Sequence, residues 1–185
     1  DYDFEHLGGT LDDAIGECYD KVARVLDLKY PGGPNVERMA REGVHSYDLP
    51  IPMNDDSFNM SFSGLKSAII NLVHNEKQRG NEINKADLAR SFQDVAIDQL
   101  CRKTELALQK YNVKYMIIAG GVSANTYLRE EIKKVTDKYN VELSVPRFLY
   151  CTDNAAMIGA AAYPLYLKGE FADLDLNASS SDELY

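Results

Sequence analysis

Residues 117–125 combine features that could hold a phosphorylated ligand against bare backbone. An apolar run is followed by the glycine pair 120–121 and then by Ser123 and Asn125. Glycines let a ligand approach the main chain closely, and the free N–H groups at a helix start attract anions. The Asn125 amide could reach a ribose or the edge of a base. Taken alone, the pattern is more typical of an ordinary turn between a strand and a helix.

Asp20 is a second candidate, on the polar face of a predicted helix. Its simplest role there is a surface ion pair with Arg24, four residues on, beside an equivalent pair of Glu17 and Lys21. Gly16 argues for something more, because a glycine within a helix costs on the order of 1 kcal/mol and often marks the close approach of another group. That group could be a ligand hydroxyl held by Asp20 or a neighbouring protein backbone.

Two further features have both plain and functional interpretations. Residues 31–34 read Pro-Gly-Gly-Pro, which is either a rigid turn or a stretch of bare backbone suited to an aromatic base or a phosphate. Asp153 precedes a predicted helix, where an acid most simply acts as a cap. As a metal ligand it would need two or three further ligands, and the sequence offers no obvious ones.

Cysteine and histidine spacing argues against a zinc site contained within this sequence. The three cysteines and three histidines are scattered, with no Cys-x-x-Cys and no His-x-x-x-His pair. The odd number and wide spacing of the cysteines also argue against a disulfide framework. Buried free thiols in a reducing cytoplasm are the simplest interpretation of Cys18, Cys101 and Cys151.

The elements that position these candidates are predicted helices and strands. They alternate along the chain, which predicts an α/β protein. Apolar spacing in the first half predicts a helix opened by Thr10, with Leu11 on its buried face, and a type II turn at residues 31–32. A short helix follows from Pro34 to near Gly43. The remaining elements predicted there are a strand-like run at 58–62, a helix at 65–74 and a loop at 75–84.

The second half predicts one long helix followed by two strands that each lead into a helix. The long helix has its apolar side at positions 88, 92, 95, 96, 100 and 107. A continuous apolar run predicts a buried strand at 115–119, and alternation predicts another strand at 141–145. Ser123 is expected to cap a helix through Asp137, and Thr152 or Asp153 a small-residue helix at 155–167.

Composition limits the classes of function. With 45% hydrophobic residues, 185 residues can build one sizeable core. Twenty basic against 29 acidic residues give a net charge of −9, which disfavours binding to bare nucleic acid or anionic lipid without a local basic patch or partner. No long apolar run or signal peptide is visible, so we expect a cytoplasmic protein with no membrane contact. Because the sequence starts at Asp1, we expect it to be processed or cut from a longer chain.

Five ordered motifs carry a resemblance to a known family. They stand at residues 10–21 (TLDDAIGECYDK), 30–34 (YPGGP), 61–66 (SFSGLK), 120–125 (GGVSAN) and 151–158 (CTDNAAMI). In this order they resemble the TsaD family, the tRNA N6-adenosine threonylcarbamoyltransferases once described as O-sialoglycoprotein endopeptidases. The resemblance runs from about residue 7 to residue 167. It implies the fold of actin, Hsp70 and sugar kinases, a ribonuclease H-like build with two lobes around a nucleotide cleft.

The resemblance also implies an activity and residue roles. Members of the family move a threonylcarbamoyl group from threonylcarbamoyl-AMP to N6 of the adenosine beside the anticodon, in tRNAs reading codons that start with A. Asp20 would hold the ribose of the adenylate, while Gly33 and Glu37 would flank the nucleoside. Asn125 would contact it from the glycine turn, and Asp153 would be one ligand of an iron or zinc ion. No catalytic residue or general base is assigned.

This sequence departs from the family by what it lacks. The first half of the family's chain carries a His-x-x-x-His metal pair and a Ser-Gly-Gly-His-Thr phosphate loop, and neither is present here. We therefore expect only the C-terminal half: residues 1–170 as the C-terminal lobe, with helix 153–168 packing on an absent N-terminal lobe, and residues 171–185 as a loose acidic tail. The metal site would be incomplete and this chain alone inactive.

Partners and alternatives follow from the same resemblance. A TsaB-like paralogue and a TsaE-like ATPase are the expected bacterial partners, and tRNA contacts would come mainly from outside this acidic chain. The older glycoprotease description leaves a metalloprotease as one alternative. A nucleotide-binding half of a sugar kinase or chaperone-like ATPase, and a non-catalytic interaction fragment, are the others.

Overall fold

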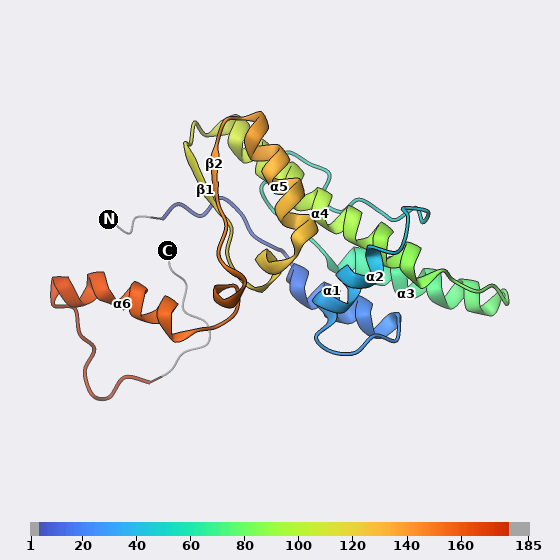
Figure 1. The fold of residues 1–185 in the computed structure, drawn as a ribbon, viewed down its shortest axis with the longest axis horizontal. Helices are drawn as coiled ribbons and strands as arrows, with labels where there is room; N and C mark the ends of the chain where they lie inside the picture. Colours follow the sequence, from blue (N-terminus) through green and yellow to red (C-terminus); the bar gives the residue numbers. More distant parts are fainter. Residues whose placement is uncertain (1–3, 178–185) are drawn as a thin grey trace.

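The computed structural model describes residues 4–177 and confirms a mixed α/β architecture. Most of it is helical, with one small sheet in which two parallel strands pair (Figure 1). The helices are α1 (Ile15–Val25), α2 (Gly32–Ala40), α3 (Ser63–Gln78), α4 (Lys85–Lys110), α5 (Thr126–Lys138) and α6 (Ala155–Lys168). The strands are β1 (Tyr115–Ile117) and β2 (Glu142–Ser144), and the short 3₁₀ turns are η1 (Gly121–Ala124) and η2 (Phe148–Tyr150).

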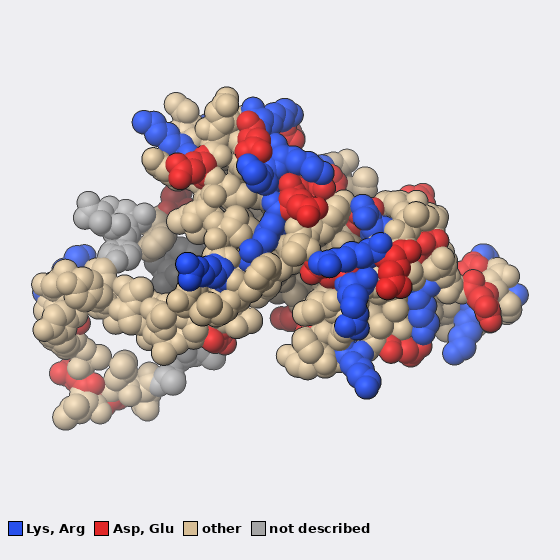
Figure 2. Space-filling view, in the orientation of Figure 1, with Lys and Arg blue, Asp and Glu red and all other residues tan. Residues whose placement is uncertain are grey.

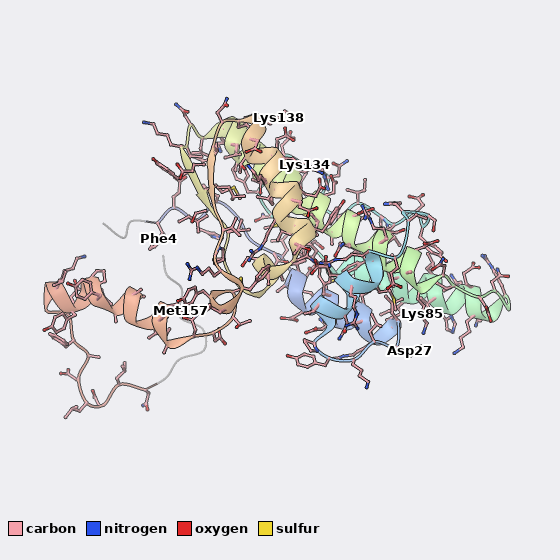
Figure 3. All side chains as sticks on the ribbon, in the orientation of Figure 1. Phe4, Asp27, Lys85, Lys134, Lys138 and Met157 are labelled. Carbon is pink, nitrogen blue, oxygen red and sulfur yellow. The ribbon has the colours of Figure 1, made fainter. Side chains whose placement is uncertain are left out.

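The larger core lies among helices α1 to α4. The predicted long helix is confirmed as α4, whose start is capped by the Asn84 side chain. The Tyr19 ring of α1 meets Phe92 of α4 edge to face, with ring centroids 4.8 Å apart. Lys85 also holds Asp27, just beyond α1, at 2.7 Å (Figure 3). Side chains with no exposed surface fill this core: Cys18, Val22, Val36, Leu65, Ile69, Leu88 and Phe92.

A second, smaller core joins the sheet to α4 and α5. Ile97, Leu128 and Ile132 are buried there against Met116 of β1 and Leu143 of β2. The opposite face of the sheet is open among residues 4–177, so Tyr115 and Ile117 are 68% and 74% exposed. The predicted strand is therefore present, but the prediction that it is buried is wrong.

Asp12 joins two of the sequence motifs. One carboxylate oxygen accepts the N–H groups of Phe62 and Ser63, and the other accepts the hydroxyls of Ser61 and Ser63 at 2.5 and 2.6 Å. Desolvation opposes the charged form, yet these four hydrogen bonds hold the pKa of Asp12 well below its usual range. Asp12 thus stabilises the start of α3 and precedes α1, which begins at Ile15.

Two predicted helix starts, those of α1 and α2, are wrong for a common reason. Helix α1 begins at Ile15, because residues 10–13 turn towards the start of α3, and Leu11 is 64% exposed. Helix α2 begins at Gly32 and ends at Ala40, so residues 31–32 form a helix start and no type II turn. In each case a tertiary contact decides where the helix begins.

The remaining boundaries are closer to prediction but use other caps. Helix α3 continues past His74 to Gln78, which shortens the predicted loop. Helix α6 is capped by Asn154, whose side chain accepts the Met157 N–H, and neither Thr152 nor Asp153 makes that bond.

Helix α6 extends away from the other helices (Figure 1) and buries no residue. Its surface is almost free of charge, as the tan region over α6 in Figure 2 shows. No helix within residues 4–177 has the length and apolar character to span a bilayer. Residues 171–177 follow as exposed coil, and the rest of the predicted acidic tail, residues 178–185, lies outside the described residues.

Candidate functional site

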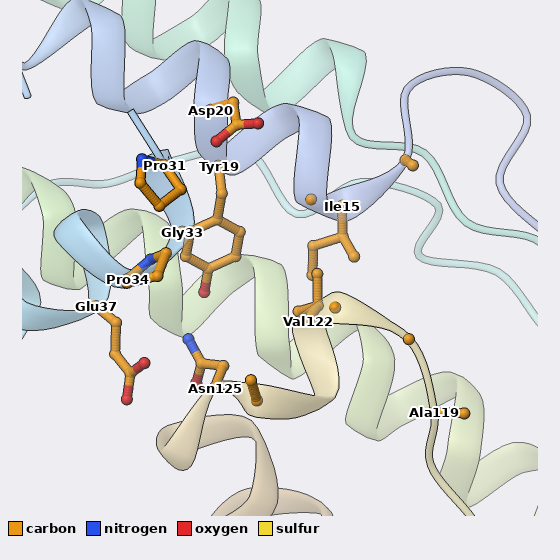
Figure 4. Close-up of a pocket in the computed structure, with 15 residues that line it drawn as sticks. Ile15, Tyr19, Asp20, Pro31, Gly33, Pro34, Glu37, Ala119, Val122 and Asn125 are labelled. Atoms are coloured by element: carbon orange, nitrogen blue, oxygen red, sulfur yellow. The ribbon is translucent and has the colours of Figure 1, made fainter. Parts of the chain in front are cut away.

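One cavity of about 580 Å³ lies where α1, α2 and η1 meet (Figure 4). This volume is within the range of small-molecule sites. Its walls include Asp20, Gly33, Glu37 and Asn125, so the structure brings together four of the five predicted site residues. The other lining residues are Ala14, Ile15, Gly16, Tyr19, Pro31, Pro34, Ala119, Gly120, Gly121, Val122 and Ala124.

The contact between Asp20 and Gly32 fixes the wall formed by α1 and α2. One Asp20 carboxylate oxygen accepts the Gly32 N–H at 2.7 Å. A side chain at Gly32 has no room, because its Cβ would lie 2.6 Å from Asp20 Cα and 2.8 Å from Ala23 Cβ. Among the described residues no ion pair joins Asp20 to Arg24, whereas Glu17 and Lys21 do pair, at 3.5 Å. The surface-pair interpretation of Asp20 is therefore wrong, and its second oxygen is not engaged by a described residue.

Gly33 presents open backbone to the cavity. A Cβ at Gly33 would meet no atom within 4 Å, in contrast to Gly32. Pro31 and Pro34 flank it, and both line the same cavity. The Pro-Gly-Gly-Pro sequence therefore serves two needs: the first glycine permits close helix packing, and the second leaves space beside the cavity.

Glu37 connects α2 to the start of α5. Its side chain is largely buried, and one carboxylate oxygen accepts the Thr126 N–H at 3.0 Å and also the Thr126 hydroxyl. Arg41 reaches the same oxygen at 2.8 Å. A carboxylate at a helix N-terminus is favourable because the helix dipole is positive there. Glu37 thus holds α5 against the cavity while lining it.

Asn125 is the residue that caps α5. Its Oδ1 accepts the Leu128 N–H at 2.8 Å, and its Nδ2 donates to Gln93 Oε1 at 3.1 Å. Ser123, the predicted cap, lies within η1 and donates to the Gly120 carbonyl at 2.6 Å. Gly120 has φ of 83°, the left-handed region that glycine adopts most readily.

Gly16 lies beside Val122 of η1 and lines the cavity. It stands near the start of α1, where a Cβ would lie 3.4 Å from the Val122 side chain. This is an ordinary van der Waals distance, so the neighbouring chain does not itself exclude a side chain at this position. The glycine leaves bare backbone in the cavity wall formed by α1, next to η1.

Sequence reasoning missed Tyr19 and Gln93. Tyr19 lines the cavity from α1 and is only 1% exposed, and its hydroxyl donates to Gln93 Oε1 at 3.4 Å. Burial raises the pKa of Tyr19 well above its ordinary value, so it stays protonated at neutral pH. Gln93 is 2% exposed, next to Phe92 on α4. The sequence does contain a signal for Gln93, because it is a polar residue next to the apolar side of the predicted long helix.

Asp153 lies apart from this cavity. It is exposed, in the turn before α6, and it is not among the cavity residues. Across the described part of the chain, no group of three or more His, Cys, Asp or Glu side chains could hold a metal ion. The donor set therefore does not fit a metal centre, and Asp153 as one ligand stays a prediction.

The cysteines also offer no reactive group to this site. All three are free, with Cys18 and Cys151 buried and Cys101 partly buried. Burial raises the pKa of both Cys18 and Cys101 to about 12, which keeps these thiols protonated and poorly nucleophilic.

Comparison with known proteins gives a consistent result. Residues 1–160 match the TsaD family model, described as tRNA N6-adenosine threonylcarbamoyltransferase. Proteins of that name from Staphylococcus carnosus and Bacillus cereus are 49% and 53% identical over 179 and 178 residues, and one from Staphylococcus saprophyticus is 49% identical over 175. These alignments cover 94–96% of this chain but 51–52% of each relative. The chain spans about half the length of the curated relatives it matches.

Proposed function

The chain belongs to the TsaD family of tRNA N6-adenosine threonylcarbamoyltransferases, and on that premise we propose that it forms the nucleoside side of a threonylcarbamoyl-AMP site. The reaction it serves moves the threonylcarbamoyl group to N6 of the adenosine beside the anticodon, in tRNAs reading codons that start with A. The observation that carries this proposal is the convergence of Asp20, Gly33, Glu37 and Asn125 on one cavity.

The cavity walls suit a nucleoside in chemical character. The free oxygen of Asp20 is an acceptor for a ribose hydroxyl. Apolar side chains such as Ile15, Val122 and Pro34 offer a surface for a flat base, and the open backbone at Gly33 allows the ligand to come close (Figure 4). The second N–H of Asn125 Nδ2 is a donor for a base or ribose acceptor.

This chain's contribution to the reaction is binding and orientation. The acyl donor is a mixed anhydride with AMP as leaving group, so no covalent protein nucleophile is required. Holding the adenylate in place brings the carbonyl within reach of the amine and lowers the entropic barrier. We assign no general base to this chain and derive no step through iron or zinc, because the described donors do not form a metal centre. This chain alone is not expected to complete the transfer.

We infer the rest of the machinery from family membership. We place residues 1–170 in the C-terminal lobe of a fold like that of actin, Hsp70 and sugar kinases, with helix 153–168 packing on the other lobe. A net charge of −9 suggests that most tRNA contacts come from elsewhere, and a TsaB-like paralogue and a TsaE-like ATPase are the proposed partners. The three free cysteines are consistent with a reducing cytoplasm.

Calorimetry with AMP tests the proposed site directly. We expect AMP to bind the 185-residue chain, with about tenfold weaker affinity in Asp20→Ala and in Asn125→Ala, as for the loss of one hydrogen bond to a polar ligand. Asp98→Ala is the control, since that carboxylate is exposed on α4 and pairs with Arg102 away from the cavity.

Asn125→Ala also removes the α5 cap, so Asn125→Asp separates the two roles. An aspartate keeps the oxygen that accepts the Leu128 N–H but replaces the amide donor. It should lose some stability, because its second oxygen would face Gln93 Oε1, and it should still weaken AMP binding at a temperature where the variant is folded. Equal AMP affinities in the parent chain, Asp20→Ala and Asn125→Asp would reject the nucleoside assignment.

A further inference from the structure

We propose that Gln93 is a positioning residue of the cavity, which it does not itself line. Together with the Leu128 N–H it holds the direction of the Asn125 amide, so that the cavity wall presents an N–H donor to its ligand. Gln93 lies behind the wall on α4, within hydrogen-bond distance of two cavity residues, Tyr19 and Asn125. This inference rests on the proposed function, because the ligand it concerns is the nucleoside part of the adenylate.

The direction of each hydrogen bond follows from one backbone group. The Leu128 N–H can only donate, so the Asn125 atom at 2.8 Å from it must be the amide oxygen. The Asn125 amide nitrogen therefore faces Gln93, and the Gln93 atom at 3.1 Å from it must be an acceptor, Oε1. The Tyr19 hydroxyl, 3.4 Å from the same oxygen, is then the donor in that pair. Figure 4 shows the Tyr19 hydroxyl and the Asn125 nitrogen facing one another.

Burial makes this arrangement strict. Gln93 is 2% exposed, Tyr19 1% and Asn125 7%, so water is largely absent as an alternative partner. A buried polar group without a partner is strongly disfavoured. Reversing Asn125 would set its N–H against the Leu128 N–H, and reversing Gln93 would set its N–H against the Asn125 N–H. The three side chains therefore have one consistent set of directions.

The consequence for the ligand is a requirement for an acceptor. The Asn125 oxygen is used by the helix, and one hydrogen of its Nδ2 is used by Gln93. What remains for the cavity is the second Nδ2 hydrogen. A ring nitrogen of a purine or an oxygen of a ribose can accept it, whereas a ligand N–H cannot. Without the Gln93 acceptor, the Asn125 side chain would keep its Leu128 contact and lose the second contact that holds its amide nitrogen, while its backbone stayed in place.

A matched pair of substitutions tests this role. Gln93→Met keeps the length of the side chain and removes its acceptor, and Gln99→Met does the same to a second buried glutamine of α4. Gln99 makes hydrogen bonds with Pro52 and Ser61. It does not line the cavity. We expect both variants to lose stability, but only Gln93→Met to bind AMP about tenfold more weakly, measured by calorimetry at a temperature where all variants are folded.

Gln93→Glu keeps the proposal testable if Gln93→Met fails to fold. A glutamate offers an acceptor oxygen at the same position in either protonation state, so AMP affinity should stay within about threefold of the parent chain. Two results would overturn the inference: parent-like AMP affinity in folded Gln93→Met, or a tenfold loss in folded Gln93→Glu. Failure of the parent chain to bind AMP would instead reject the proposed function, and this inference with it.

Discussion

The cavity region and helix α6 differ in how far their apolar residues are buried. Helix α1 mixes charged and apolar residues and, as its apolar spacing predicts, buries Cys18, Tyr19, Val22 and Ala23. Helix α6 is far more apolar and carries only one charged residue, Lys168, yet it buries nothing among the described residues. Burial therefore follows from the neighbours an element has, and apolar content alone does not secure it.

The two regions also differ in how they treat polar groups. Around the cavity, the buried side chains of Glu37, Gln93, Ser123 and Asn125 all make hydrogen bonds inside the protein. Such satisfied networks give a side chain one direction, which is what a binding site needs. Helix α6 has 14 residues, mostly apolar, and offers few polar side chains for such a network. It is also too short to span a bilayer. The buried polar side chains around the cavity have partners, whereas α6 has the composition of a core element without being buried.

Truncating one ring in each region should give the largest contrast. Phe92→Ala removes a fully buried ring that packs on Tyr19, so we expect a loss of about 3–5 kcal/mol in the free energy of unfolding. Tyr163→Ala on α6 removes a side chain that is 60% exposed and should change it by less than about 0.5 kcal/mol. Urea denaturation followed by circular dichroism measures both values. A loss above 1 kcal/mol in Tyr163→Ala would show that α6 packs against the protein in solution.

The glycine pair of α2 sharpens the description of the cavity. Gly32→Ala places a methyl group 2.6 Å from Asp20 Cα and should destabilise the protein by about 1–3 kcal/mol through overpacking. Gly33→Ala enters open space and should leave the free energy of unfolding within about 0.5 kcal/mol of the parent. Its effect should appear in AMP affinity, because the added methyl group occupies ligand space. Equal stability of the two variants would contradict the close packing between α1 and α2.

The sequence was informative about the site because ordered motifs, and not single residues, carried the prediction. Asp20, Gly33, Glu37 and Asn125 were each assigned from a resemblance, and all four line one cavity. Local reasoning alone favoured plain roles for them, such as an ion pair or a turn. Periodicity also predicted α4 well, since a long amphipathic helix with a strong cap depends mainly on local sequence.

The errors lie where distant parts of the chain meet. Asp12 falls within the helix predicted to open at Thr10, but its oxygens accept hydrogen bonds from residues 61–63, some fifty positions away. Gln93 was missed for the same reason, because its two partners come from other elements. Exposure of β1 and α6 depends on which surfaces cover them, and periodicity does not contain that information.

Asp12 offers a smaller effect with a distinct pH dependence. Asp12→Ala removes the acceptor for two N–H groups at the start of α3 and should cost about 1 kcal/mol at pH 7. Since folding lowers the pKa of Asp12, the contribution is complete above the ordinary aspartate pKa of about 4 and is lost as the pH falls towards the folded value. The difference in unfolding free energy between parent and variant should therefore shrink below about pH 4.

Asp56→Ala is the control for that measurement, because Asp56 is exposed in the loop before α3. It should change neither the stability at pH 7 nor its dependence on acid. An Asp12→Ala difference that grows as the pH falls would contradict the assigned hydrogen bonds.

The smallest expected effect on stability is also the sharpest test of α6. Ile158 and Leu167 are 65% and 66% exposed, so the double substitution to glutamate should leave the free energy of unfolding within about 0.5 kcal/mol of the parent. Exposed apolar surface promotes association, so the same variant should self-associate less in sedimentation velocity. If the double variant instead unfolds readily, α6 contributes to the core of this chain. If stability is unchanged and association falls, α6 is an apolar element whose packing partner lies outside the described residues, and the contrast with the cavity region holds.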